Sequence, residues 1–347
     1  MIRGDARESS TPATILDVAA LAGVSRTTVS RVMNEPERVT APTLEKVRAA
    51  AASLKYHPSA AARTLRSGRT GTIALVVGDI SQPFHGALAQ AVAREAGGRN
   101  MTVVLHDLSH REERLVTVLE NLAEQGIDAV VLSTADLLDS APVAGAIATL
   151  TGQGIPIINS LGGLEIPNVH VLGLDHARSA RTATAALLDA GARSVGLMVG
   201  NPTDSYSSQL RTGYRQALTG TSGTKAGPAL EIVGNYGFEQ ARCAVGALLE
   251  AGTPLEGLVV ANTPMALGAI RAAAEHGHPI PGELRLICCE EVGLAEYVRP
   301  TIATVAADVE NCGREIMVLL DQALSGTVPV PAKILPTMRH RETFPRP

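Results

Sequence analysis

Residues 25–34 (SRTTVSRVMN) gather side chains that can form hydrogen bonds with DNA. The guanidinium groups of Arg26 and Arg31 can each bind O6 and N7 of a guanine, and Thr27 can reach a neighbouring base edge. We therefore expect Arg26, Thr27 and Arg31 to read bases. Short hydroxyl and amide side chains nearby suit phosphate oxygens, which position a protein on DNA without specifying the sequence. They are Thr14, Ser25, Thr28, Ser30 and Asn34.

Two short helices joined by a tight turn would hold these side chains in place. Ile15, Val18, Ala19 and Ala22 recur at helical spacing and predict an apolar face on a first helix. Gly23 follows them, and glycine readily adopts the positive φ that such a corner requires. The first helix is therefore expected to end at this glycine.

A second helix should begin after Ser25, because a serine hydroxyl suits an N-cap. Val29 and Val32 would then pack inward, and the arginines would point away from the core. A helix-turn-helix uses a second helix of this kind to enter the major groove of DNA. A third helix is predicted over residues 40–54, with Thr40 as its N-cap.

Charge is divided unevenly along the chain of 347 residues. Residues 1–69 carry 11 lysines and arginines against 6 acidic residues, and the remainder carries 19 against 28. Net charges of +5 and −9 therefore make up the −4 of the whole chain. A basic segment attached to an acidic body is typical of a protein that docks one end on phosphates.

Three sequence stretches closely resemble the LacI/GalR family of bacterial transcription regulators. They are DVAALAGVSRTTVSRVMN, LKYHPSAAARTLRSGRTGTIALVVGDISQPF and VVANTPMALGAIRAAAEHG. The resemblance runs from about Thr14 to Pro345 and places DNA specificity at Arg26, Thr27 and Arg31. It implies a repressor that binds double-stranded operator DNA and whose affinity for DNA is set by a small-molecule effector.

The resemblance also assigns a role to the basic segment 59–70. In the family, this segment forms a hinge helix on operator DNA, and a leucine wedges between base steps in the minor groove. The matching residues here are Ala62, Arg63, Leu65 and Arg66. Ser59 departs from the family's usual asparagine, although serine also caps helices. A connector that merely packs Leu65 on the body is the alternative.

Beyond residue 70, apolar strands alternate with alanine-rich helices, which predicts doubly wound parallel sheets. The strand–helix units are too many for one compact sheet, so we expect two lobes. The resemblance implies a pair of lobes like those of periplasmic binding proteins, with chain crossovers near residues 189–191, 304–307 and 326–329. The predicted organisation is a disordered tail (1–13), an all-α helix-turn-helix domain (14–58), a hinge (59–70) and an α/β effector and dimerisation domain. In the latter, one lobe holds residues 71–189 and 306–326, and the other holds 190–304 and 327–345.

In such a body, ligands bind between the lobes, where strands end. Polar and aromatic residues that follow predicted strands are therefore the candidates for an effector site. They are Asp79, Gln82, Phe84, His85, Asp175, Asn262 and Glu290. Asp79 and Asp175 could instead cap the helices that follow them, and Asn262 could hold a turn.

Four family positions in this pocket are altered. Leu210 replaces an arginine, and the adjacent Arg211 should point elsewhere because one helical residue turns a side chain by about 100°. Thr263 replaces an aspartate, Glu290 takes the place of another aspartate, and Ala307 replaces a glutamine. The effector is therefore expected to be less polar than a simple sugar, or the pocket to be vestigial.

Other features argue against an enzyme or a metalloprotein. No Walker A or GxGxxG fingerprint is present, and neither a cofactor nor a metal is expected. The histidines are scattered, which is typical of surface or capping residues. The cysteines lack metal-ligand spacing and are expected to be small buried residues. They are Cys243, Cys288, Cys289 and Cys312.

The polar first residues show no export signal, and no apolar run is long enough to span a membrane. We therefore predict a cytoplasmic, nucleoid-associated homodimer that is not an enzyme. The alternatives are a solute-binding protein, or an α/β enzyme with a DNA-binding head.

Overall fold

The computed structural model describes residues 13–56, 68–135, 138, 140–162, 166–220 and 227–346. The chain divides into two compact units, Met1–Thr70 and Gly71–Pro347, and each is considered by itself. The predicted tail, apart from Ala13, lies outside the described residues, as do the predicted hinge residues Ser59, Ala62, Arg63, Leu65 and Arg66.

The first unit is helical, with elements in the order α1 (Ile15–Ala22), α2 (Arg26–Asn34), the short 3-10 helix η1 (Pro36–Arg38) and α3 (Ala41–Ser53). Thr14 begins α1 with a capping box: its backbone N donates to Oδ2 of Asp17 at 2.8 Å, and the N of Asp17 donates back to the Thr14 hydroxyl at 3.4 Å. Gly23 ends α1 with φ of 63° in the left-handed region. The predicted corner is thus confirmed.

A small apolar core fixes the angle between these helices. Val18 on α1, Val29 on α2 and Val47 on α3 are fully buried against one another's helices. Thr40 precedes α3 as expected, but its side chain does not cap the helix backbone. Its hydroxyl instead forms a hydrogen bond with the hydroxyl of Thr43 at 3.0 Å.

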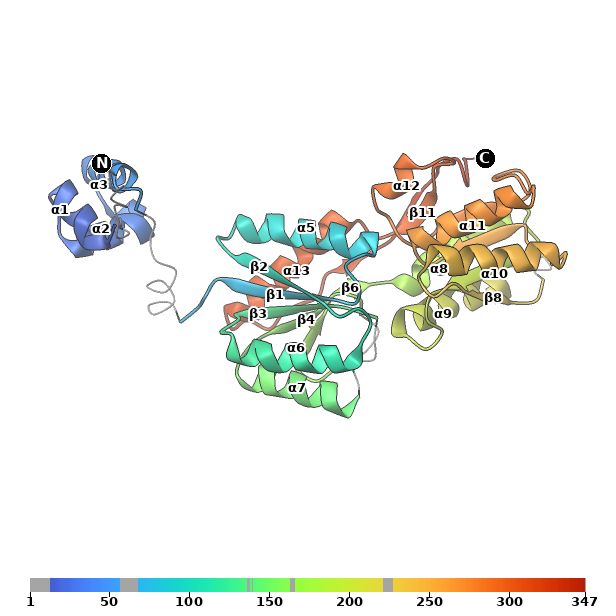
Figure 1. Cartoon of the computed structure of the whole chain (residues 1–347), viewed down its shortest axis with the longest axis horizontal. Helices are drawn as coiled ribbons and strands as arrows, with labels where there is room; N and C mark the ends of the chain where they lie inside the picture. The colour runs from blue at the N-terminus through green and yellow to red at the C-terminus, as the bar shows by residue number, and fades with distance from the viewer. Residues whose placement is uncertain are drawn as a thin grey trace, which may run out of the picture. The chain divides into compact units, whose positions relative to one another are not determined.

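The second unit contains two lobes, each a sheet covered by helices on both faces (Figure 1). The first sheet has the strand order β2-β1-β3-β4-β5 and is parallel throughout. Its strands are β1 (Thr72–Val77), β2 (Thr102–Asp107), β3 (Ala129–Ser133), β4 (Ile157–Asn159) and β5 (Val169–Val171). One face packs on α5 (Pro83–Gly97) and α13 (Val309–Leu324), and the other on α6 (Glu112–Glu124) and α7 (Ala141–Gly152).

The second sheet has the strand order β13-β11-β10-β9-β7-β8, with only β13 antiparallel to its neighbour. Its strands are β7 (Val195–Val199), β8 (Leu230–Val233), β9 (Gly257–Val260), β10 (Arg285–Cys288), β11 (Ala303–Ala306) and β13 (Thr337–Arg339). The helices are α8 (His176–Asp189), α9 (Ser205–Gly220), α10 (Phe238–Glu250), α11 (Thr263–Glu275) and the short α12 (Leu294–Tyr297).

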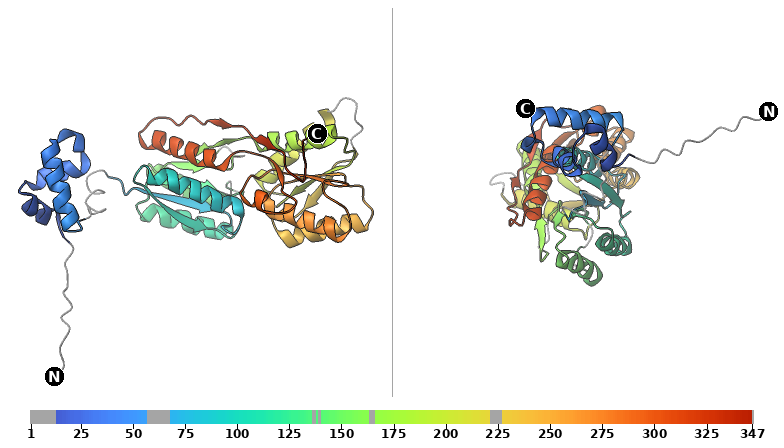
Figure 2. Two further views of the ribbon diagram at one scale, coloured as in Figure 1. Left: turned by 90° about the horizontal axis from the view of Figure 1, so that it is seen from above. Right: turned by 90° about the vertical axis from the view of Figure 1, so that its left-hand side faces the viewer.

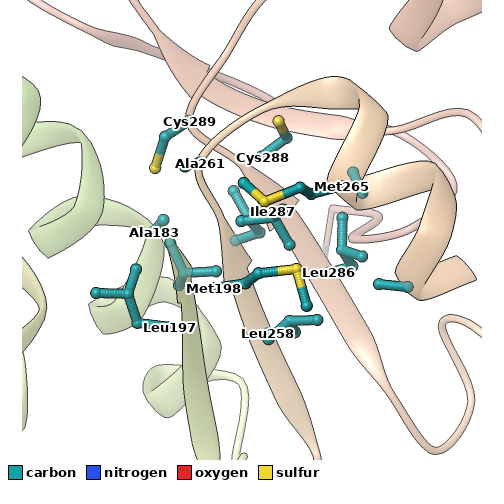
Figure 3. Packing of buried hydrophobic residues seen from close by; sticks show 14 of the residues in the cluster. Ala183, Leu197, Met198, Leu258, Ala261, Met265, Leu286, Ile287, Cys288 and Cys289 are labelled. Atoms are coloured by element: carbon teal, nitrogen blue, oxygen red, sulfur yellow. The ribbon is translucent and has the colours of Figure 1, made fainter. Parts of the chain in front are cut away.

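Between the sheet and its helices lies one continuous core, shown from close by in Figure 3. Met198 of β7 is fully buried and points toward Met265 of α11, whereas Ile287 of β10, also fully buried, lies on the opposite face of the sheet. Cys288 and Cys289 lie in this core as free thiols, as expected for small buried residues. Cys312 is also buried, whereas Cys243 is exposed and departs from that prediction.

The first and third passages of the chain between the lobes differ from the predicted ones, whereas the second lies between β11 and α13, next to the predicted 304–307. Helix α8 packs against α9 and β9 in the second lobe, so the first crossover precedes α8 rather than following it at 189–191. The continuous apolar run Val169–Leu174 hides this break, because β6 (Gly173–Leu174) leaves the first sheet and pairs with β12 (Lys333–Ile334). The third crossover likewise lies between β12 and β13 rather than at 326–329. The two crossing strands lie side by side (Figures 1 and 2).

None of the helices formed by the described residues is long and apolar enough to cross a membrane.

Candidate functional site

Helix α2 presents the three predicted base-reading side chains to solvent. Arg26, Thr27 and Arg31 are exposed, whereas Val29 and Val32 of the same helix are buried. The helical period therefore places the hydrogen-bonding side chains on one side of α2 and its anchoring residues on the other. This is the arrangement that a helix needs to enter a groove while it remains fixed to its domain.

The residues predicted to contact phosphate border the same helices. Ser25 caps α2, because its Oγ accepts a hydrogen bond from the N of Thr28 at 3.1 Å. Thr28 and Ser30 are half-buried, and Thr14 is exposed beside α1. The hydroxyl of Thr14 donates to Oδ2 of Asp17 at 2.7 Å, and this hydrogen bond lowers the pKa of Asp17. Of Asn34 only the backbone position, at the end of α2, is described.

The second unit contains a cleft between its lobes, at the carboxyl ends of several strands. Residues from both lobes line it: Gln82, Phe84, His85, His110, Ala135, Leu161, Leu174, His176, Tyr206, Tyr236, Asn262, Cys289, Glu290, Glu291, Ala306, Ala307 and Cys312. Apolar and aromatic side chains predominate, which is typical of pockets for small molecules.

Several contacts join the lobes across this cleft, including a hydrogen bond of 3.4 Å from Nε2 of Gln82 to the carbonyl oxygen of Tyr236. Nδ2 of Asn262, in the second lobe, donates to Oε1 of Gln82, in the first lobe, at 2.9 Å. The same Nδ2 lies 3.1 Å from the carbonyl oxygen of Tyr236. The ring of Tyr236 stacks on that of His110, with centroids 6.2 Å apart and planes 13° apart. The lobes are therefore held together by a few polar and aromatic groups.

The deepest acidic group of the cleft is Glu290, which is 9% exposed. Its Oε2 accepts a hydrogen bond from the N of Thr263, the first residue of α11, at 2.9 Å. Burial raises the pKa of this carboxyl group, because the protein interior disfavours the charged form. The hydrogen bond to the helix terminus acts in the opposite direction.

Beside Glu290, a histidine and a tyrosine from the second lobe meet edge to face. The ring centroids of His176 and Tyr206 lie 4.6 Å apart with an interplanar angle of 80°. The Tyr206 hydroxyl donates to the carbonyl oxygen of Ala261 at 2.9 Å. Burial lowers the pKa of His176 to about 4, so its imidazole is neutral near pH 7.

Five predicted effector residues line the cleft, namely Gln82, Phe84, His85, Asn262 and Glu290. Asp79 and Asp175 do not. The Asp79 carboxylate accepts hydrogen bonds from the backbone N and the hydroxyl of Ser81, both at 2.8 Å. Asp175 caps α8 through the N of Arg178 at 2.9 Å. Asp175 thus caps the helix that follows it, whereas Asp79 stabilises a turn and does not cap α5, because short carboxylates readily accept from nearby backbone N–H groups.

The altered family positions have clear structural consequences. Arg211 points away from the cleft, as expected, and forms an ion pair with Glu231 through hydrogen bonds of 2.6 and 2.7 Å. Leu210 is fully buried in the core of the second lobe. The backbone N of Thr263 donates a hydrogen bond to the Glu290 carboxyl group, and Ala307 lines the cleft.

Several lining residues were not expected to be there, above all His110, His176, Tyr206 and Tyr236. The interpretation of the scattered histidines as surface or capping residues is wrong for His110 and His176, which line the cleft together with His85, an expected effector residue. Each follows the carboxyl end of a strand or begins the next helix. Their position relative to strand ends was the signal that could have found them.

Two family models match separate parts of the chain. The model for bacterial regulatory proteins of the lacI family matches residues 14–59, and that for a periplasmic binding protein-like domain matches residues 184–344. The HTH-type transcriptional regulator GalR of Salmonella typhimurium is 33% identical over 319 residues, which cover 92% of this chain and 91% of GalR.

Solved structures show the same similarity. The transcriptional regulator CelR in complex with cellobiose is 27% identical with a TM-score of 0.68, covering 95% of this chain and 99% of CelR. The Lac repressor dimer bound to operator and an anti-inducer is 24% identical with a TM-score of 0.80, covering 97% of this chain and all of that chain. The helical first unit and the two-lobed second unit are thus a known combination.

Proposed function

We propose that this chain, which belongs to the lacI family of bacterial regulatory proteins, is a repressor that binds a pseudo-palindromic operator as a homodimer in the cytoplasm. Members of this family are DNA-binding transcriptional regulators, and a small molecule in the interlobe cleft would set the affinity of this one for DNA. The exposure of Arg26, Thr27 and Arg31 on an otherwise anchored helix carries the proposal. The relatives are named as regulators, and we propose that this chain acts by binding rather than by catalysis.

Base reading is assigned to Arg26, Thr27 and Arg31, and phosphate contacts to Thr14, Ser25, Thr28, Ser30 and Asn34. Ala62, Arg63, Leu65 and Arg66 would contribute the minor-groove contacts that the family resemblance implies. In the cleft, Gln82, Phe84, His85, Asn262 and Glu290 would contact the effector, together with Tyr236 and His110. The relatives support regulation by a ligand, since the solved CelR structure contains cellobiose.

Binding should require two copies of the chain on one operator. A single head offers only three candidate base-reading side chains, too few to single out a genomic site. Two heads related by a two-fold axis would occupy successive major grooves about 34 Å apart. A footprint on a genomic fragment is therefore expected to show two symmetric half-sites, with a stoichiometry of two chains per duplex.

Nuclease footprinting combined with mass photometry of the complex measures both quantities. A protected region limited to one asymmetric half-site, occupied by one chain, contradicts the proposal. Half-sites cut from the same operator provide the control, because each alone should bind with much lower affinity than the intact site.

A further inference from the structure

The interlobe cleft gathers much of the aromatic content of a chain that has little of it. The sequence contains 3 phenylalanines, 5 tyrosines and no tryptophan. Phe84, Tyr206 and Tyr236 all line the cleft, together with His85, His110 and His176. Aromatic side chains offer flat apolar faces, which pack well against the faces of planar or sugar rings. The lining therefore suits a ligand that presents a ring.

The charged residues of the cleft also limit which ligands it can bind. None of the residues that line it in the described part of the chain is a lysine or an arginine. The two ionisable acids are Glu290 and Glu291. Glu291 is already paired, since Nη2 of Arg341 lies 2.7 Å from its Oε1, and the same carboxylate accepts a further hydrogen bond from Thr304. Glu290 faces the cleft, and no lysine or arginine of the described residues forms an ion pair with it.

The start of α11 offers no place for an anion either. Helix N-termini attract anionic ligands through their unpaired N–H groups. Here the N of Thr263 donates to Glu290, and the N of Met265 donates to the side chain of Asn262 at 3.0 Å. The protein's own acceptors thus occupy these donors. An incoming phosphate or carboxylate would lie against the Glu290 carboxyl group without a compensating charge.

The second lobe presents acceptors instead. The ring of His176 forms a hydrogen bond to the backbone of Leu161, and its Nε2 is covered and has no hydrogen-bond partner. Because the ring is neutral near pH 7, Nε2 is available as an acceptor. A buried acceptor without a partner is unfavourable, and a ligand donor that reached it would remove that cost. Glu290 offers a second acceptor beside it.

From these contacts we infer that the effector is a ring-bearing molecule without an anionic group, which donates O–H or N–H hydrogen bonds to Glu290 and His176. This inference rests on the proposed function of the cleft as the effector site, and it narrows the effector class. Glu290 then acts in two ways: it accepts a donor from the correct ligand, and it leaves the charge of a phosphorylated or carboxylated analogue without a balancing cation in the lining.

Matched pairs of small molecules test the inference directly. Each pair shares a ring and differs in charge: phenyl β-glucoside and phenyl β-glucuronide, galactose and galacturonate, adenosine and adenosine monophosphate, tyramine and 4-hydroxyphenylacetate. Thermal shift identifies binders to the full-length protein, and calorimetry gives their dissociation constants. We expect binders only among neutral or cationic members, with each anionic partner at least about tenfold weaker.

The variant Glu290→Gln separates charge from shape, because its amide oxygen can still accept from the N of Thr263. In each pair, the ratio of the dissociation constant of the anionic ligand to that of its neutral or cationic partner should fall at least tenfold. The variant should bind the neutral or cationic ligand more weakly and tolerate the anion. Glu120→Gln removes the same charge from an exposed position on α6 and should leave every dissociation constant unchanged.

An anionic member that binds wild type as tightly as its neutral partner overturns the inference. So does a panel in which no member shifts the melting temperature, since the cleft is then closed by the Gln82–Asn262 contact rather than open to ligands. A neutral ligand that binds as expected but leaves operator affinity unchanged supports the ligand class and rejects the proposed regulation. Failure of the inferred ligand class and failure of the proposed regulation therefore give different results.

Discussion

Replacing Gly213 with alanine is expected to lower the stability of the second unit by about 3 kcal/mol or more, the upper end for overpacking of a core. Gly213 lies on α9 where this helix crosses the start of α8. An added methyl group would lie 2.6 Å from the carbonyl carbon and 3.0 Å from the Cα of Ala177. Both neighbours are backbone atoms, so no side-chain rotation can relieve the overlap.

Urea unfolding of the purified second unit, residues 71–347, measures the effect if the wild-type unit gives a single transition. Gly145→Ala is the matched control, because Gly145 lies on the exposed face of α7 and an added Cβ would meet no atom within 4 Å. Alanine has the higher helix propensity, so this variant should be stabilised by up to about 1 kcal/mol. Equal stability of Gly213→Ala and wild type would mean that α8 and α9 pack less closely than described.

Replacing Arg26 with alanine is expected to weaken operator binding by about 1–3 kcal/mol, which corresponds to roughly 5- to 150-fold. Arg26 begins α2, is exposed, and can reach a base edge where a guanidinium discriminates guanine from other bases. The loss should be concentrated at one base step, so the variant should also accept substitutions there that wild type rejects. Titration of operator variants by fluorescence anisotropy measures both effects.

Arg38→Ala is the control variant, because it removes one positive charge without removing a candidate base-reading side chain. Arg38 lies outside α2, in η1, and forms an exposed ion pair with Glu35 at 3.1 Å, which contributes little to stability. Its loss should leave the base preference unchanged. If Arg26→Ala lowers affinity for operator and random duplex by the same factor, Arg26 contacts only phosphate, and the assignment of base reading to this residue is wrong.

The helical head was predictable from sequence because its determinants are local. The Thr14 cap, the Gly23 corner and the spacing of Val18, Val29 and Val32 lie within a few residues of the structures they specify. The corresponding helices begin and end where the pattern indicates. Thr40 precedes α3 as predicted, but its hydroxyl accepts no hydrogen bond from the α3 backbone and bonds to the hydroxyl of Thr43 instead.

The lobes were less predictable because their organisation depends on contacts between distant segments. The residues 169–174 form one apolar run, yet they divide into β5 in the first sheet and β6, which pairs with a strand more than 150 residues later. No local signal marks that division. Helix α13, by contrast, returns to the first lobe after the chain has built most of the second, within the residues 306–326 that the family resemblance placed there.

The location of the cleft was predictable from the sequence, but only some of the residues that line it were. Strand ends correctly indicated Gln82, Asn262 and Glu290, because the carboxyl ends of parallel strands converge. Asp79 and Asp175 accept hydrogen bonds from nearby donors instead, and for Asp175 this is the helix cap that the sequence had left open as the alternative. The sequence did not reveal that His110 and His176 would lie in the cleft with His85, since their proximity arises only when the two lobes face each other.

Selection from a randomised duplex library, sequenced after binding to the full-length protein, tests the central claim that α2 reads DNA sequence. Wild type is expected to enrich one pseudo-palindromic motif, and Arg26→Ala and Arg31→Ala should each degrade the preference at symmetric positions of both half-sites. The account is contradicted if wild type enriches no motif, or if both variants enrich the wild-type motif with undiminished base preference.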